Sequence, residues 1–257
     1  MSGLILDARI DGGPPLHLLL DSGAARITLG ARASAKSAIS PFSESHLAGF
    51  GEWPARSARF GVAGAVDVGP LRFGNCRVNV AHSELAAGID GLIPMSLFGG
   101  FLIRLDLPGK AMDLTPYPDR DAARTAGSAR AIRRGGLLFV RGALNDALKG
   151  YIFLDTGASY SAISQRTARV LKSKPVSAIA LQGAGGAVNG DLIAGRIRYH
   201  VASQSLTAET VVALDLKAFS AFNRVETIGI LGYPALRAFI LTVSYRDALV
   251  RIDAPPN

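Results

Sequence analysis

The sequence predicts a mainly β protein built from two homologous lobes that a pseudo-twofold axis relates. Two observations favour this fold class. First, 29 Gly and 13 Pro punctuate short runs rich in Val, Ile and Leu, which is typical of strands joined by turns rather than of long helices. Second, three blocks of sequence occur twice in the same order. A chain of 257 residues has room for two lobes of about 100–130 residues each.

The first repeated block is an apolar strand that ends in Asp, a hydroxyl residue, Gly and Ala. Residues 18–24 and 152–158 carry it, which places Asp21 and Asp155 134 residues apart (155 − 21 = 134). The other repeats keep this order. Segments 47–51 and 181–185 have the same spacing, whereas 91–94 and 229–232, followed by 101–105 and 239–243, have a spacing of 138 (231 − 93 = 138). The chain therefore contains an internal duplication.

Hairpins are expected to lead into both aspartates. Residues 4–10 with a turn at 11–14 precede Asp21, and residues 137–144 with a turn at 145–146 precede Asp155. Short helices are expected at 95–100 and 233–239 as the helical feature common to both lobes, with a further candidate helix at 161–171.

The lobes are expected at residues 1–115 and 135–257. The segment between them, 116–134, is rich in Pro, Arg, Ala and Asp and has no sustained apolar period, so it is interpreted as a linker.

Composition excludes several classes of site. Cys76 is the sole cysteine, so no intramolecular disulfide forms, and no Cys/His spacing indicates a metal. The four histidines, His17, His46, His82 and His200, are scattered and receive no role. The formal charge of +8 is spread along the chain without a nucleic-acid module, so it indicates at most a weak preference for acidic partners.

No apolar run approaches the ~20 residues of a membrane span. We therefore expect a soluble chain that binds neither membrane nor nucleic acid and acts as a monomer without a cofactor. Its compartment stays open: cytoplasmic as the chain stands, or periplasmic or secreted if a leader was removed.

A single Asp at a strand end is usually a turn residue. Two copies related by a twofold axis change that interpretation, because the axis brings equivalent loops together. Asp21 and Asp155 would then share one proton and supply an acid and a base for attack by water on a peptide bond. Gly23 and Gly157 would permit the close approach, and Ser22 and Thr156 would join the two loops. These six residues are the candidate site.

The block at 155–159, the later 230–232 and the variant motif at 21–24 resemble the retropepsin-like aspartic peptidases, in particular the bacterial type with both halves in one polypeptide. The resemblance covers nearly the whole chain. It implies two retropepsin/pepsin-like closed-barrel lobes with few short helices, a peptide or protein substrate, and a flap hairpin over the cleft. By position, the flap tips would be Gly49, Phe50 and Gly51 in the first lobe and Gly183, Ala184 and Gly185 in the second. Ordinary surface hairpins are the alternative for both.

Two positions in the first lobe depart from the family pattern. Pro94 stands where the second lobe has Gly232, and Ala25 stands opposite Ser159. Two interpretations are open. Pro94 occupies the first position of a helix, where proline is tolerated, or the first lobe has diverged from the family pattern. Because Ala24 and Ala158 provide no hydroxyl to the carboxylates, we expect an activity optimum at mildly acidic to neutral pH.

An aspartic endopeptidase is the leading functional hypothesis. The alternative is a non-catalytic peptide-binding module that keeps the fold, which Pro94 and Ala25 motivate. A structural adaptor with an anion-binding basic surface has only the net charge in its favour.

Overall fold

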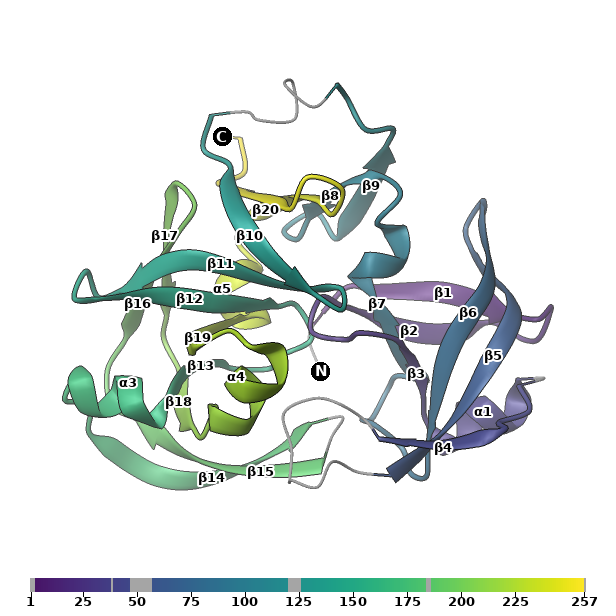
Figure 1. Cartoon of the computed structure of the whole chain (residues 1–257), viewed down its shortest axis with the longest axis horizontal. Coiled ribbons are helices and arrows are strands. Elements are labelled where there is room, and N and C mark those ends of the chain that lie inside the picture. The colour runs from purple at the N-terminus through teal and green to yellow at the C-terminus, as the bar shows by residue number, and fades with distance from the viewer. Residues whose placement is uncertain (1–2, 38, 47–56, 120–125, 184–185, 257) are drawn as a thin grey trace.

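The computed structural model describes residues 3–37, 39–46, 57–119, 126–183 and 186–256. It is mainly β, with two barrel-like lobes side by side and a smaller sheet across their top (Figure 1). The mainly β prediction is confirmed. The helices in the described part of the chain are short, and none is long and apolar enough to cross a bilayer.

The first lobe is a closed barrel. Its strands follow the order β1-β2-β7-β3-β6-β5-β4, and β1 also pairs with β5, which closes the ring. The central strand β7 is buried at every residue, as expected for a strand between two neighbours and beneath covering layers. The elements are β1 Ile5–Ile10, β2 Leu16–Asp21, β3 Ile27–Leu29, α1 Ala31–Lys36, β4 Ser43–His46, β5 Ser57–Val68, β6 Leu71–Ala81, β7 Gly91–Pro94, the 3-10 helix η1 Met95–Phe98, β8 Leu102–Asp106 and β9 Ala111–Thr115.

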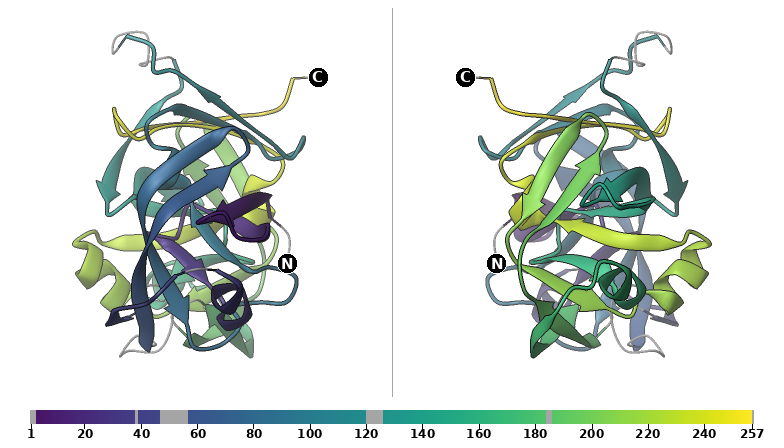
Figure 2. Two further views of the ribbon diagram at one scale, coloured as in Figure 1. Left: turned by 90° about the vertical axis from the view of Figure 1, so that its right-hand side faces the viewer. Right: turned by 90° about the vertical axis from the view of Figure 1, so that its left-hand side faces the viewer.

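The second lobe repeats this plan with a different middle. The first lobe has one long strand, β5, which pairs with β4, β6 and β1. In the second lobe the corresponding stretch is divided into β15, which pairs with β14, and β16, which pairs with β17 and β11. Figure 2 shows the two lobes from their outer sides. The elements are β10 Ala129–Arg134, β11 Leu137–Leu144, β12 Leu148–Asp155, β13 Ser161–Ser164, α3 Gln165–Val170, β14 Pro175–Gly183, β15 Gly186–Ile193, β16 Ile197–Val201, β17 Gln204–Ala208, β18 Val211–Leu214, α4 Lys217–Asn223, β19 Thr227–Gly232, α5 Tyr233–Leu236, β20 Ile240–Ser244 and β21 Leu249–Asp253.

The lobes share a sheet at the top of Figure 1, where β8 pairs with β20. The register joins Arg104 to Thr242, and it also joins Leu102 to Ser244 and Ile240 to Asp106. Because these strands occupy positions 138 residues apart in the duplication, the pairing is symmetric about the Arg104–Thr242 pair (242 − 104 = 138). The pseudo-twofold axis therefore passes between β8 and β20.

Both expected hairpins and both common helices are present, as β1–β2, β11–β12, η1 and α5. Two expectations need correction. Residues 161–164 of the candidate helix form strand β13, and only 165–170 are helical as α3. A second helix is also common to both lobes, because α1 occupies the positions 134 residues before α3.

The expected linker is also partly regular. Its residues 129–134 form β10, which pairs with β11 and β21. Ala and Ile side chains of β10 are half-buried between exposed basic residues, so the weak apolar pattern concealed the strand.

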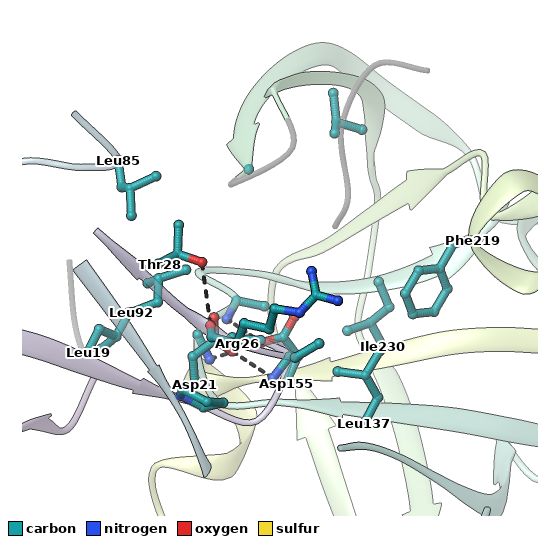
Figure 3. A pocket seen from close by; sticks show the side chains of 18 of the residues that line it. Leu19, Asp21, Arg26, Thr28, Leu85, Leu92, Leu137, Asp155, Phe219 and Ile230 are labelled. Atoms are coloured by element: carbon teal, nitrogen blue, oxygen red, sulfur yellow. Dashed lines mark hydrogen bonds between the residues drawn. The ribbon is translucent and has the colours of Figure 1, made fainter. Parts of the chain in front are cut away.

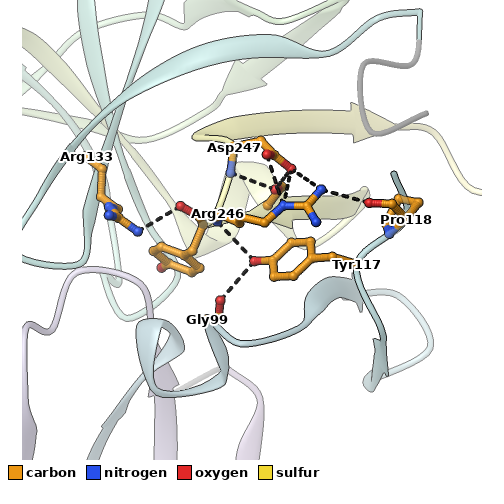
Figure 4. Close-up of polar contacts among 8 residues, drawn as sticks. Gly99, Tyr117, Pro118, Arg133, Arg246 and Asp247 are labelled. Carbon is orange, nitrogen blue, oxygen red and sulfur yellow. Dashed lines mark hydrogen bonds and ion pairs between the residues drawn. The ribbon is translucent and has the colours of Figure 1, made fainter. Parts of the chain in front are cut away.

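The start of the linker is fixed to both lobes (Figure 4). Tyr117 donates a hydrogen bond from its hydroxyl to the Gly99 carbonyl at 2.9 Å and accepts one from the Arg246 backbone N–H at 3.1 Å. The Arg246 guanidinium lies 4.4 Å from the Tyr117 ring centroid and donates to the Pro118 carbonyl. Asp247, in turn, accepts hydrogen bonds from the same guanidinium. This cluster holds the chain as it leaves β9.

Candidate active site

Asp21 and Asp155 are the last residues of β2 and β12, and the fold brings them together at the lobe junction. Each strand runs parallel to a buried neighbour, so that Asp21 is in register with Pro94 of β7 and Asp155 with Gly232 of β19. The two residues are 8% and 7% exposed. Each carboxyl group lies close enough to the other to influence its pKa.

Ser22 and Thr156 join the two loops by four reciprocal hydrogen bonds. Ser22 Oγ donates to the Leu154 carbonyl at 2.9 Å and accepts from the Thr156 N–H at 3.0 Å. Thr156 Oγ1 donates to the Leu20 carbonyl at 3.0 Å and accepts from the Ser22 N–H at 3.0 Å. Every bond has its twofold mate, and all four are buried. The loops therefore hold one another in place across the lobe boundary.

Gly23 and Gly157 allow the aspartates to approach. A Cβ atom added to Gly23 would lie 2.6 Å from the Asp155 carboxyl carbon, and one added to Gly157 would lie 2.5 Å from that of Asp21. No side chain fits at these distances. The backbone N–H groups here also serve the carboxyls: Gly23 donates to Asp21 Oδ1 at 2.6 Å, while Gly157 and Ala158 donate to Asp155 Oδ1 at 2.9 and 3.0 Å.

Burial raises the pKa of both carboxyl groups. For Asp155 the pKa is well above its ordinary value, first because of desolvation and then because of the neighbouring Asp21 charge. Desolvation also raises the pKa of Asp21, but N–H groups and the bond from Asp155 oppose it. Burial and the proximity of the two carboxyl groups favour a state in which the pair holds one proton. Since the groups interact directly, the pair titrates as a unit.

A cleft of about 1670 Å³ opens above the aspartates (Figure 3). Leu19, Leu85 and Leu92 line it on the first-lobe side, and Leu137, Phe219 and Ile230 on the second-lobe side. The first set belongs to a small apolar cluster with Ile89, and the second to a larger one that includes five aromatic side chains. An extended apolar ligand would thus meet an aliphatic wall on one side and a larger, partly aromatic wall on the other.

The expected flap tips fall mostly outside the described residues: Gly49, Phe50, Gly51, Ala184 and Gly185 all do. Gly183 ends β14, pairs with Gly186, and lines the cleft together with Gln182 and Leu181. Among the described residues, no group of three His, Cys, Asp or Glu side chains could hold a metal ion.

The departure at Pro94 is matched by a second change. In the second lobe, the Gly232 N–H donates to Ser161 Oγ at 3.0 Å. The equivalent pair in the first lobe is Pro94, which has no N–H, and Ile27, which has no hydroxyl. The donor and the acceptor are therefore both absent, and no polar group is left without its partner at this position.

Several residues at the site were not expected from the sequence. Arg26, Thr28 and Asn79 line the cleft, and burial together with the Asp21 charge raises the pKa of Tyr245. Thr28 and Asn79 sit at matched positions of neighbouring parallel strands. Polar and apolar residues alternate along 26–29 and along 76–80. This alternation is the sequence signal that the polar residues of each strand lie on one face.

Comparison with known proteins gives two positive findings. Residues 140–235 match the family model described as aspartyl protease. The fold is similar to the crystal structure of an aspartic proteinase from Irpex lacteus, with 13% identity, a TM-score of 0.60, and coverage of 97% of this chain and 93% of that chain. The chain has no match among curated proteins.

Proposed function

We propose that this chain is an aspartic endopeptidase that uses Asp21 and Asp155 to activate water at the lobe junction. The family match over residues 140–235 and the pepsin-like fold support this proposal. The observation that carries the proposal is the reciprocal arrangement of two buried carboxyls, each approached by the glycine of the opposite loop, at the base of an open cleft. Both aspartates come from one polypeptide, so the proposed active form is a monomer.

The mechanism begins with one proton on the pair. Asp21, as carboxylate, accepts a proton from a water molecule while the oxygen attacks the peptide carbonyl carbon, and Asp155 donates its proton to the carbonyl oxygen. The tetrahedral intermediate collapses when Asp21 passes its proton to the leaving nitrogen and Asp155 takes a proton back from the oxygen. The C–N bond breaks, and the pair returns to its starting state without a covalent enzyme intermediate.

The singly protonated pair must exist at the working pH. Burial raises the pKa of both groups, so the state with one proton extends to higher pH than for exposed carboxyls. This supports the expectation of a mildly acidic to neutral optimum. A rate that rises steadily below about pH 3, far under the ordinary carboxyl pKa, would contradict it.

The test is a digest of an unbiased peptide library by the wild type, Asp21→Asn and Asp155→Asn. Wild type should cut, and each variant should lose cleavage by at least about 10³-fold, because either acid or base is missing. Circular dichroism and thermal unfolding check that both variants stay folded. Cleavage at the wild-type rate by either variant would rule out the shared pair, and intact but tightly bound peptide with all three proteins would establish the peptide-binding alternative.

A further inference from the structure

We propose that the first-lobe wall of the cleft selects an acidic side chain of the substrate, whereas the matched wall of the second lobe selects an apolar one. The inference deepens the proposed function, on which it rests, by naming the substrate class. The enzyme would favour peptides with Asp or Glu near the scissile bond on one side and an apolar residue at the matched position on the other.

The first-lobe wall is polar and cationic. Arg26 directly precedes β3, and Thr28 follows it two residues later, so both point to the same face. Strand β6 runs parallel beside β3 with Thr28 in register with Asn79, which places Arg77 next to Arg26. All four residues line the cleft. Two arginines and two buried polar residues therefore form one continuous surface close to Asp21.

The second lobe has apolar residues at the matched positions. Tyr160 corresponds to Arg26, and Ala162 corresponds to Thr28 (a spacing of 134 in each case, 160 − 26 and 162 − 28). Ala162 is in register with Val212, just as Thr28 is with Asn79. Because the two walls derive from equivalent strands, the contrast in charge is a difference between equivalent subsites.

The Arg26 guanidinium is held in place and keeps its hydrogen-bond donors available. Its central carbon lies 5.5 Å from the centroid of the Phe60 ring, a stacking arrangement that restricts the side chain. Within the described residues, neither Arg26 nor Arg77 forms an ion pair with a carboxylate. A planar guanidinium fixed in this way is suited to bind a carboxylate through two parallel hydrogen bonds.

The other charges of the cleft add to this preference. Arg134 and Arg224 line the second-lobe side, and outside the catalytic pair Asp215 is the one carboxylate among the described lining residues. Asp215 Oδ1 accepts a hydrogen bond from the Lys217 N–H. The cleft beyond the aspartates is thus positively charged, and an acidic peptide would be attracted into it.

The experiment measures binding, so that it does not depend on cleavage. The ligands are fluorescent ten-residue peptides with capped ends and Leu-Phe at the centre. In one pool a single Glu is placed at each of the remaining positions in turn, and in the second pool Gln replaces that Glu. Fluorescence anisotropy with the Asp155→Asn protein gives the affinity of each. We expect Glu to bind about tenfold more tightly than Gln at one position near the centre, a ratio that reflects one charge-assisted contact.

Variants identify the wall. Arg26→Gln and Arg77→Gln, each in the Asp155→Asn background, should bring the Glu-to-Gln ratio close to one, and Arg26→Glu should favour Lys over Gln at that position. Arg169→Gln removes one positive charge from the exposed part of α3 outside the cleft and should leave the ratio unchanged. Tyr160→Gln should weaken the binding of peptides with an aromatic residue at the matched position without changing the ratio.

Equal affinity for the two pools, or a ratio that survives both Arg26→Gln and Arg77→Gln, would overturn the inference. The outcomes separate it from the proposed function. Arginine-dependent Glu binding without any cleavage by wild type would uphold the acidic subsite and reject hydrolysis. Cleavage by wild type with no Glu preference in binding would do the reverse.

Discussion

At the scale of single residues, Asp155 combines the catalytic role that we propose for it with a cost to stability. Its pKa is raised in the folded protein, chiefly by burial, whereas in the unfolded chain an Asp titrates near about 3.9. Between these two values the folded state binds the proton more tightly than the unfolded state does. The free energy of unfolding therefore decreases as pH rises from about 4 through the raised pKa.

We predict that Asp155→Asn reduces this slope and raises stability at neutral pH. An Asn side chain keeps an oxygen to accept from Gly157 and Ala158, and its NH2 group can donate to Asp21 as the protonated acid does. Thermal unfolding is measured from pH 4 to pH 8. Between about pH 4 and the raised pKa of Asp155, the free energy of unfolding of the variant should increase relative to that of wild type by up to about 1.4 kcal/mol per pH unit. Glu226→Gln, in an exposed pair with Arg166, is the control and should not gain. Parallel curves for Asp155→Asn and wild type would contradict the raised pKa.

The residue scale also shows where sequence reasoning stops. The duplication predicted that Asp21 and Asp155 would meet, because a constant register carries equivalent strand ends to the axis. It could not interpret Pro94, since the significance of that residue depends on Ile27, which lies far from it in sequence and beside it only in the barrel. A local pattern does not contain the partner of a hydrogen bond that has been lost.

At the scale of elements, the loops after β2 and β12 act as one unit. Thr156 and Ser22 each donate one hydrogen bond and accept another across the lobe boundary, and no water is needed to complete the set. The hydroxyl group, rather than the size of the side chain, is the feature that matters.

We predict that Thr156→Val destabilises the protein by about 2–4 kcal/mol, because the Ser22 N–H and the Leu20 carbonyl lose their partner in a buried site. Chemical denaturation with a fixed slope measures the change. Thr156→Ser keeps the hydroxyl and should cost about 1 kcal/mol or less for the missing methyl group. If Val and Ser have the same effect, the hydrogen bonds do not hold the loops together.

The elements that the sequence missed have physical reasons. Helix α1 has no side-chain cap at Gly30, and its Arg32 N–H is instead satisfied by Glu84, which comes from a distant loop. Helix α3 does carry a local signal, since Ser164 accepts from the Thr167 N–H as a helix cap. A helix cap supplied by a neighbouring residue could be predicted from the sequence, whereas a cap supplied by a distant loop could not.

At the scale of the whole molecule, the cleft walls come from the segments that differ most between the two lobes. The first lobe supplies residues of β6 and of the loop before β7, whereas the second supplies residues of β14, β15 and α4. The approach of Asp21 and Asp155 was therefore predictable from internal symmetry, and the lining of the cleft was not. Phe98 and Tyr233, the aromatic residues of the two equivalent short helices, are buried in the core.

The two lobes should nevertheless unfold together. They share the sheet through β8 and β20, and the catalytic loops are hydrogen-bonded across the boundary. Opening the first lobe alone would leave the β20 edge and the buried hydroxyl of Thr156 without partners, and both losses oppose independent unfolding.

Cys76 provides the means to test this. It is the sole cysteine, it lies on β6 of the first lobe, and it is buried in a core cluster that contains residues of both lobes. We predict that Thr156→Val, a change in the second lobe, speeds the reaction of Cys76 with a thiol reagent by the factor that corresponds to its loss of global stability, about 30-fold or more for 2–4 kcal/mol. Val176→Ala, at an exposed position of the second lobe, should leave the rate unchanged. A Cys76 rate that rises with low concentrations of denaturant in the wild type but is insensitive to Thr156→Val would mean that the first lobe opens on its own. In that case the shared sheet would join two independent folding units, and the geometry of the catalytic pair would depend on the weaker of them.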